Sequence, residues 1–299
     1  MTTSTDANPT TIADRVAKMH EAMAGQIPDA VFGAFGAEQA GLDARGVPTG
    51  IAEPGDTLGD FDLLDVHGAP TTLSSALGGR TAVVVLYRGA WCPYCNLALR
   101  AYQDDLAPTL AGNGIGLVAI SPQKPDGSLS AQQKNELTFT VVSDPGNTIA
   151  TRLGVMTAPT DDAQAAQRAI GFDLPAANAD GTYGVPMPTV VIVDATGVIR
   201  WIDVHPNYTT RTEVSDILAA LLLASPAASQ IHGAILPVDG GGTATSNLTD
   251  SRAQSGRPLV TGLGRRLLNE MADPPSSATT DENPPRSLRS SHLLPTTSP

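Results

Sequence analysis

Both cysteines of the chain lie three positions apart, in the stretch YRGAWCPYCNLAL of residues 87–99. The apolar run AVVVL comes directly before this stretch, so Cys92 and Cys95 lie where a buried strand ends and a helix begins. At the N-terminus of a helix, unpaired backbone N–H groups and the helix dipole stabilise a thiolate and lower the pKa of a thiol. The spacing therefore predicts a redox-active pair, with Cys92 as the nucleophile and the more enclosed Cys95 as the resolving thiol.

Two other interpretations of the pair remain open. A structural zinc ion needs four ligands, and the sequence has neither a second C-x-x-C nor a close pair of histidines, so we expect no metal. Simple packing is the other alternative, because free cysteine is among the most buried residue types. Pro93 lies between the cysteines and fits the first turn of a helix, where its missing N–H is not needed. Its position agrees with the redox interpretation.

Three residues before the pair are candidates for shaping its surroundings. Arg88 is the nearest cation that could stabilise a thiolate, while Tyr87 and Trp91 could form a wall of the site. A surface charge and two core aromatic residues would explain the same residues equally well. A buried carboxylate base is not evident, because the preceding strand reads AVVVL.

The elements that must position these residues alternate between strands and helices. Apolar runs predict strands and 3.6-residue periodicity predicts helices. We expect strands at 61–68, 81–87, 114–121 and 138–144, a further sheet edge at 70–77, a hairpin at 189–204, and helices at 96–112, 130–137, 147–154 and 210–224. Such an alternation with a terminal hairpin indicates an α/β layer fold.

Composition excludes several classes of partner. The 299-residue chain has a formal net charge of −12, so it repels phosphate backbones, and we expect no binding to nucleic acid. The first 23 residues lack the basic and apolar regions of a signal peptide and instead predict an amphipathic helix, with Thr11 and Asp14 as a capping box. No apolar run reaches the length of a membrane span. We therefore expect a soluble, cytoplasmic protein.

Several longer segments resemble one family in their order along the chain. They are GDTLGDFDLLDVHGAPTTLSSAL, YRGAWCPYCNLALR, AISPQKPDGSLSAQQKNELTFTVVSD and MPTVVIVDATGVIR. From about residue 55 to 221, the chain resembles the peroxiredoxin-like group of the alkyl hydroperoxide reductase and thiol-specific antioxidant family. The resemblance implies a thioredoxin-like fold, with a central mixed sheet flanked by helices, over residues 51–224. Residues 1–50 would then form an N-terminal helical extension.

The sequence departs from the classical peroxiredoxin pattern at two places. That pattern has P-x-x-x-T-x-x-C before the peroxidatic cysteine, whereas here Gly89 stands at the Thr position and Val85 at the Pro position, counting back from Cys92. Pro188 aligns with the later arginine of the classical site. The dipeptide between the cysteines, Pro93–Tyr94, is the one that glutaredoxins use. The resemblance thus implies a hybrid active site.

The M-P-T segment implies the proline loop of thioredoxin-like proteins, because Pro188 comes just before a buried strand. We therefore predict a cis Met187–Pro188 bond facing the cysteines. The predicted site-shaping residues are Arg88, Trp91, Pro93, Tyr94, Pro188 and Thr189.

The resemblance implies an antioxidant thiol peroxidase that acts on hydrogen peroxide or organic hydroperoxides and needs no cofactor. Cys92 would become a sulfenic acid, Cys95 would condense with it to a disulfide, and thioredoxin or a low-molecular-weight thiol would reduce that disulfide. A disulfide reductase of the thioredoxin or glutaredoxin type would use the cysteines in the same order. A redox-inert interaction module is the third alternative, because fold does not guarantee activity. A second copy of the chain is a further candidate partner.

The C-terminal part has a different character. Residues 222–244 resemble the end of short-chain dehydrogenases, where a strand carries L-P-V-D-G-G. The rest of that family's motifs is missing, since Tyr208 is followed four positions later by Thr212 where the family has Lys. We therefore interpret residues 225–244 as a fusion remnant without nicotinamide chemistry. Residues 245–299, rich in Ser, Thr and Pro, predict a disordered tail.

Overall fold

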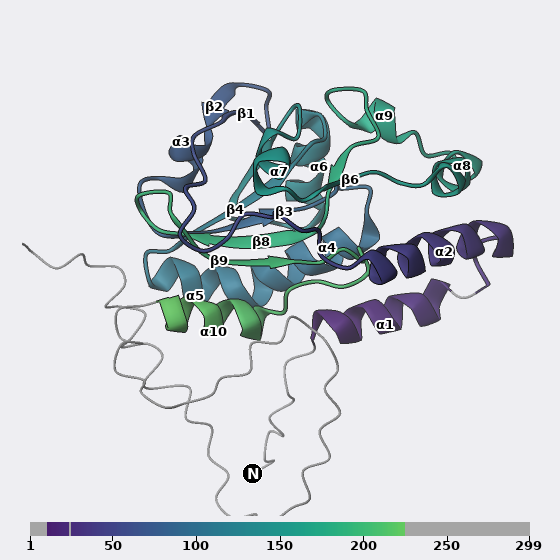
Figure 1. Ribbon diagram of the computed structural model, residues 1–299, viewed down its shortest axis with the longest axis horizontal. Coiled ribbons are helices and arrows are strands. Elements are labelled where there is room, and N and C mark those ends of the chain that lie inside the picture. Colours follow the sequence, from purple (N-terminus) through teal and green to yellow (C-terminus); the bar gives the residue numbers. More distant parts are fainter. Residues whose placement is uncertain (1–10, 24, 225–299) are drawn as a thin grey trace, which may run out of the picture.

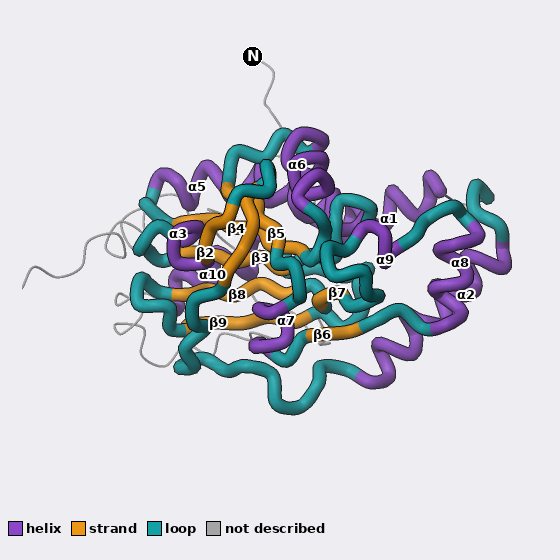
Figure 2. The backbone as a smooth tube through the Cα atoms, turned by 90° about the horizontal axis from the view of Figure 1, so that it is seen from above, coloured by secondary structure: helices purple, strands orange, loops and turns teal. Residues whose placement is uncertain are grey.

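The computed structural model describes residues 11–23 and 25–224 of the chain. Seven strands form one mixed sheet in the order β2–β1–β5–β4–β3–β8–β9 (Figures 1 and 2). The three parallel strands are central, and the strands outside them run antiparallel to their neighbours. The strands are β1 (Asp62–Asp65), β2 (Pro70–Thr72), β3 (Ala82–Leu86), β4 (Gly116–Ser121), β5 (Thr140–Ser143), β8 (Thr189–Val193) and β9 (Ile199–Val204).

Strand β3 is one of the three central parallel strands and leads into the cysteine pair. All five of its residues are buried, because helices cover both faces of the sheet there. Val83 and Val85 pack into the hydrophobic cluster on one face, and Val84 and Leu86 into the cluster on the other. This two-sided burial explains why the sequence reads as a continuous apolar run rather than an alternation.

Helices cover the sheet on both sides, so the fold has three layers (Figure 1). One face carries α4 (Pro93–Ala101), the π-helical turn η1 (Tyr102–Leu106), α5 (Ala107–Gly112) and α10 (Val214–Ala224). The other face carries α3 (Leu73–Leu77) and α7 (Thr148–Leu153). The other elements between β4 and β8 are α6 (Pro125–Lys134), α8 (Asp161–Ala169), α9 (Leu174–Ala177) and a small ribbon of β6 (Met156–Thr157) and β7 (Val185–Pro186).

Helices α8 and α9 and the β6–β7 ribbon lie in a stretch where the sequence predicted no element. Two further expectations differ at element ends. The expected sheet edge at 70–77 ends at Thr72, whose side chain accepts a hydrogen bond from Ser75 N and so begins helix α3. The helix expected at 130–137 begins five residues earlier, at Pro125, in a position that suits proline at the first helical turn. Both differences arise at element ends, where capping groups decide between helix and strand.

The N-terminal extension forms two helices, α1 (Ile12–Met23) and α2 (Asp29–Arg45). The predicted capping box is present, because Asp14 N donates to Thr11 Oγ1 and Thr11 N donates to Asp14 Oδ2. Helix α1 packs beside α4, the helix that carries Cys95, and α2 packs against α8. The extension therefore lies against the part of the fold that holds the cysteines (Figure 1).

No helix within residues 11–23 and 25–224 is long and apolar enough to cross a membrane. The predicted dehydrogenase-like remnant and disordered tail, at 225–244 and 245–299, lie outside the described residues. Both stay predictions.

Candidate active site

The cysteines lie at the start of helix α4, as the sequence predicts. Cys92 is the N-cap residue with an extended backbone, and Pro93 takes the first helical position. Cys95 lies one turn inside the helix. Both are free thiols, with 1% and 0% of their surface exposed. Neither sulfur is open to solvent in this conformation.

The loop before Cys92 shows why Gly89 stands where classical peroxiredoxins have Thr. Its φ of 149° is one that side chains rarely adopt. A Cβ atom at this position would also lie 2.3 Å from Trp91 Nε1. A threonine cannot fit without moving Trp91 away from the loop.

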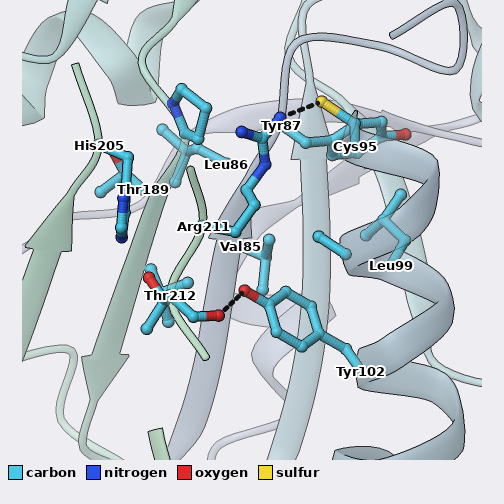
Figure 3. A pocket seen from close by; sticks show the side chains of 13 residues that line it. Val85, Leu86, Tyr87, Cys95, Leu99, Tyr102, Thr189, His205, Arg211 and Thr212 are labelled. Atoms are coloured by element: carbon cyan, nitrogen blue, oxygen red, sulfur yellow. Dashed lines mark hydrogen bonds between the residues drawn. The ribbon is translucent and has the colours of Figure 1, made fainter. Parts of the chain in front are cut away.

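A single guanidinium contacts both sulfur atoms. Arg211 Nη2 lies 3.1 Å from Cys95 Sγ (Figure 3). The same nitrogen lies 3.8 Å from Cys92 Sγ. Its other terminal nitrogen, Nη1, donates to the backbone carbonyls of Tyr208 and Thr210. The side chain is buried, and within the described part of the chain it forms no salt bridge with a carboxylate.

Sequence reasoning missed Arg211 and selected Arg88 instead. Arg211 comes 116 residues after Cys95, at the end of an irregular segment that follows β9, and no local pattern marks it as a partner of the cysteines. The sequence shows only that an arginine lies in the connection between the hairpin and the last helix. Tertiary packing alone brings it to the pair.

The two thiols are coupled, and their pKa values move in opposite directions. Burial raises the pKa of Cys92, and the neighbouring Cys95 raises it further. Burial also acts against ionisation of Cys95, but the hydrogen bond from Cys92 and the charge of Arg211 outweigh it and hold the pKa of Cys95 well below its usual range. The pKa order and the shorter contact with Arg211 both favour the thiolate on Cys95, whereas the sequence argument predicted the lower pKa for Cys92.

Arg88 is buried near the pair but does not bond to either sulfur through its guanidinium. The guanidinium carbon lies 4.0 Å from the ring centre of Tyr208 and 5.0 Å from that of Trp91. Its positive charge still lowers the pKa of both thiols, though by less than burial changes them. The hydroxyl of the same Tyr208 donates to Glu38 Oε2 at 2.7 Å. Glu38, from α2, is a buried carboxylate that the sequence analysis did not identify.

A small cavity of about 10 Å³ adjoins Cys95, enough for one water-sized molecule (Figure 3). Pro188, Thr189, Arg211 and His205 are among the residues that line it. The sequence prediction of Pro188 and Thr189 beside the cysteines thus agrees with their position. The Thr189 hydroxyl donates to the Met187 carbonyl at 2.8 Å.

The prediction of a cis Met187–Pro188 bond is wrong. The described residues contain no cis peptide bond. Met187 N donates to Val155 O, and His205 N donates to Pro188 O, so backbone hydrogen bonds hold the chain on both sides of this bond. The bond between these two hydrogen-bonded residues is trans, which is the conformation that X–Pro bonds ordinarily prefer.

The remaining predicted residues contact two different parts of the fold, the extension and the segment between α8 and α9. The Tyr94 hydroxyl lies 2.8 Å from His20 Nε2 of α1, and burial raises the pKa of Tyr94. The ring of Trp91 packs on Phe172 with centres 4.8 Å apart. Within the described residues, no group of three or more His, Cys, Asp or Glu side chains is arranged to hold a metal ion.

The sheet order, with a C-x-x-C pair after β3, one of the three central parallel strands, defines a protein of the thioredoxin fold. Residues 54–202 match the model of the AhpC/TSA family, so this part of the chain is similar to that family. The protein is peroxiredoxin-like. Helices α1 and α2, and the segment with Tyr208 and Arg211, lie outside the matched range.

Two relatives from strains of Mycobacterium tuberculosis, both named provisionally as peroxiredoxins, are 32% identical over 101 residues. The match covers 34% of this chain and 63% of each relative, so the chain spans less than two thirds of their length.

Solved structures with a similar arrangement share little sequence. Peroxidoxin BcpB from Mycobacterium tuberculosis has a TM-score of 0.42 at 21% identity, over 52% of this chain and 89% of that one. A thiol peroxidase from Chromobacterium violaceum has a TM-score of 0.42 at 16% identity, over 57% and 87%. A protein provisionally named a disulfide isomerase, from Bacteroides thetaiotaomicron, has a TM-score of 0.36 at 18% identity, over 52% and 80%.

Proposed function

We propose that the protein is a thiol peroxidase that reduces small peroxides through Cys92 and Cys95. The observation that carries the proposal is the contact of one buried guanidinium, Arg211, with both sulfur atoms. A nearby cation favours the thiolate, which is the form that attacks a peroxide. The same cation can stabilise negative charge on the peroxide oxygens as the O–O bond breaks.

We assign the first attack to Cys92 and the second role to Cys95. Cys92 thiolate displaces hydroxide from the peroxide and becomes a sulfenic acid, and Cys95 then displaces water from it and forms the disulfide. A resting thiolate on Cys95, the sulfur nearer to Arg211, fits this order, because Cys95 could then accept the proton that Cys92 must lose. Two equivalents of an external thiol, from thioredoxin or a low-molecular-weight thiol, restore the pair.

The tight enclosure of the pair favours hydrogen peroxide as the substrate over a bulky hydroperoxide. The cavity of about 10 Å³ beside Cys95 and Arg211 holds about one water-sized molecule, and Cys92 is not among the residues that line it. Because both sulfurs are buried, the covering side chains must move before any larger substrate can reach them.

Single-cysteine variants test this function. With a thiol reductant present, Cys92→Ser should abolish peroxide removal, and Cys95→Ser should allow one stoichiometric oxidation that a sulfenic-acid trap captures. Normal turnover by Cys95→Ser would show that the two-cysteine mechanism is wrong. If the intact protein reduces insulin disulfides rapidly but removes peroxide no faster than free thiol does, the protein is a disulfide reductase, and no activity in either assay would leave a redox-inert module.

A further inference from the structure

Three buried charged side chains surround the cysteine pair. Arg88 and Arg211 each carry a positive charge at 4% and 9% exposure, and Glu38 carries a negative charge at 5% exposure. Glu38 accepts a hydrogen bond from Tyr208, and the ring of Tyr208 lies against Arg88, so these two charges oppose each other across one aromatic ring. Arg211 then keeps one positive charge, because no carboxylate among the described residues forms a salt bridge with it.

A buried guanidinium without a counter-charge is costly, because the interior cannot replace the water that solvates it. The groups that accept hydrogen bonds from the Arg211 guanidinium are the two sulfurs and two neutral carbonyls. One thiolate in the pair would balance the charge. The reduced form can carry that thiolate, whereas the disulfide is neutral and leaves Arg211 unbalanced.

We propose that the Cys92–Cys95 disulfide is a strong oxidant of small monothiols, because its reduction returns the counter-charge of Arg211. This proposal rests on the proposed function only in that the two cysteines form a disulfide. The disulfide takes two electrons from two thiols, the thiols form their own disulfide, and the reduced pair keeps one proton and releases the other to solvent. A low-molecular-weight thiol pool would then reduce the protein without a dithiol protein partner.

Other titratable groups face the pair, and their behaviour limits what can cause a pH dependence. Burial raises the pKa values of Tyr87, Tyr94, Tyr102 and Tyr208, so these side chains remain neutral near pH 7. His205 lines the cavity and contacts Asp203, with Nε2 and Oδ2 2.9 Å apart. Since histidine ordinarily titrates near neutral pH, His205 needs a control variant of its own.

The test equilibrates the full-length protein with reduced and oxidised glutathione between pH 6.0 and 7.5 and measures the reduced fraction by thiol labelling. One proton is released for each disulfide reduced, so the equilibrium constant should rise about tenfold for each pH unit. His205→Gln should keep this slope. A constant that does not change with pH would show that the reduced pair carries no thiolate, and would overturn the proposal.

A second arm replaces the cation. Arg211→Met should lower the equilibrium constant at pH 7 by about tenfold or more, equivalent to roughly 30 mV, whereas Arg80→Met, at an exposed arginine, should leave it unchanged. If Arg211→Met does not fold, the pH slope of the intact protein decides alone. Slow peroxide removal together with the expected slope and variant effect would contradict the peroxidase function but support this proposal. An unchanged constant in a folded Arg211→Met would contradict this proposal whatever the peroxidase rate.

Discussion

At the scale of single residues, the site depends on a short segment after β9 that must stay close to helix α4. The Tyr102 hydroxyl, at the start of η1, donates to the Thr212 carbonyl at 2.7 Å, and both residues are buried (Figure 3). Thr212 also donates through its hydroxyl to Asp203 of β9 at 2.8 Å. These bonds hold Arg211 over the sulfur atoms.

Removing the Tyr102 hydroxyl should therefore loosen this segment. We expect Tyr102→Phe to lower the free energy of unfolding by about 1–3 kcal/mol, because the buried Thr212 carbonyl loses its partner. Tyr183→Phe is the matched control, since its hydroxyl only accepts a bond from the exposed Arg168 and its loss should cost about 0.5 kcal/mol or less. Urea unfolding of the reduced proteins measures both, and equal effects would show that the bond of Tyr102 adds nothing specific.

At the scale of elements, helix α1 packs on α4. A residue close to the site in sequence binds the first turn of α1. The Glu213 carboxylate accepts hydrogen bonds from Ile12 N at 2.8 Å and Ala13 N at 2.9 Å. A carboxylate at this position satisfies free N–H groups and complements the positive end of the helix dipole. Access to the cysteines should therefore depend on Glu213.

Replacing Glu213 by Gln removes the charge and one acceptor oxygen. We expect α1 to become about 1 kcal/mol easier to open, so alkylation of the reduced cysteines by neutral iodoacetamide should become about fivefold faster. Asp216→Asn is the control, because this exposed carboxylate lies one turn further along and has no bond to α1. If both variants react at the wild-type rate, α1 does not limit access to the pair.

At the scale of the whole molecule, all proposed site residues lie between the start of α1 and the end of α10. The sheet is complete at β9, and α10 closes one face with Ile217 and Leu221 in the core. The family match also ends within β9, at residue 202. Catalysis should thus need no residue after Ala224.

Truncation after Ala224 tests this expectation. The truncated protein should keep thiol-dependent peroxide removal within about tenfold of the full chain, a difference of less than about 1.4 kcal/mol in the barrier. The comparison uses equal concentrations of folded protein, checked by circular dichroism. A soluble and folded truncation with less than about a tenth of the activity would show that residues 225–299 contribute to the site.

The sequence by itself determined the main strands of the large sheet, the position of the cysteines and the start of α1. Strand β3 and the hairpin of β8 and β9 follow from apolar runs, and the capping box of Thr11 and Asp14 follows from their spacing. These features depend on backbone geometry and on residues a few positions apart, so a local pattern contains the whole cause.

Only the tertiary structure decided which charges reach the sulfur atoms and in which direction each thiol pKa moves. Arg211 lies 116 residues from Cys95, and Glu38 reaches Tyr208 across 170 residues. The pKa order of the two thiols and the trans bond before Pro188 likewise depend on contacts with distant segments. Burial and charge act through space, so the arrangement that sets the chemistry exists only when the sheet, α2 and the segment after β9 are packed together.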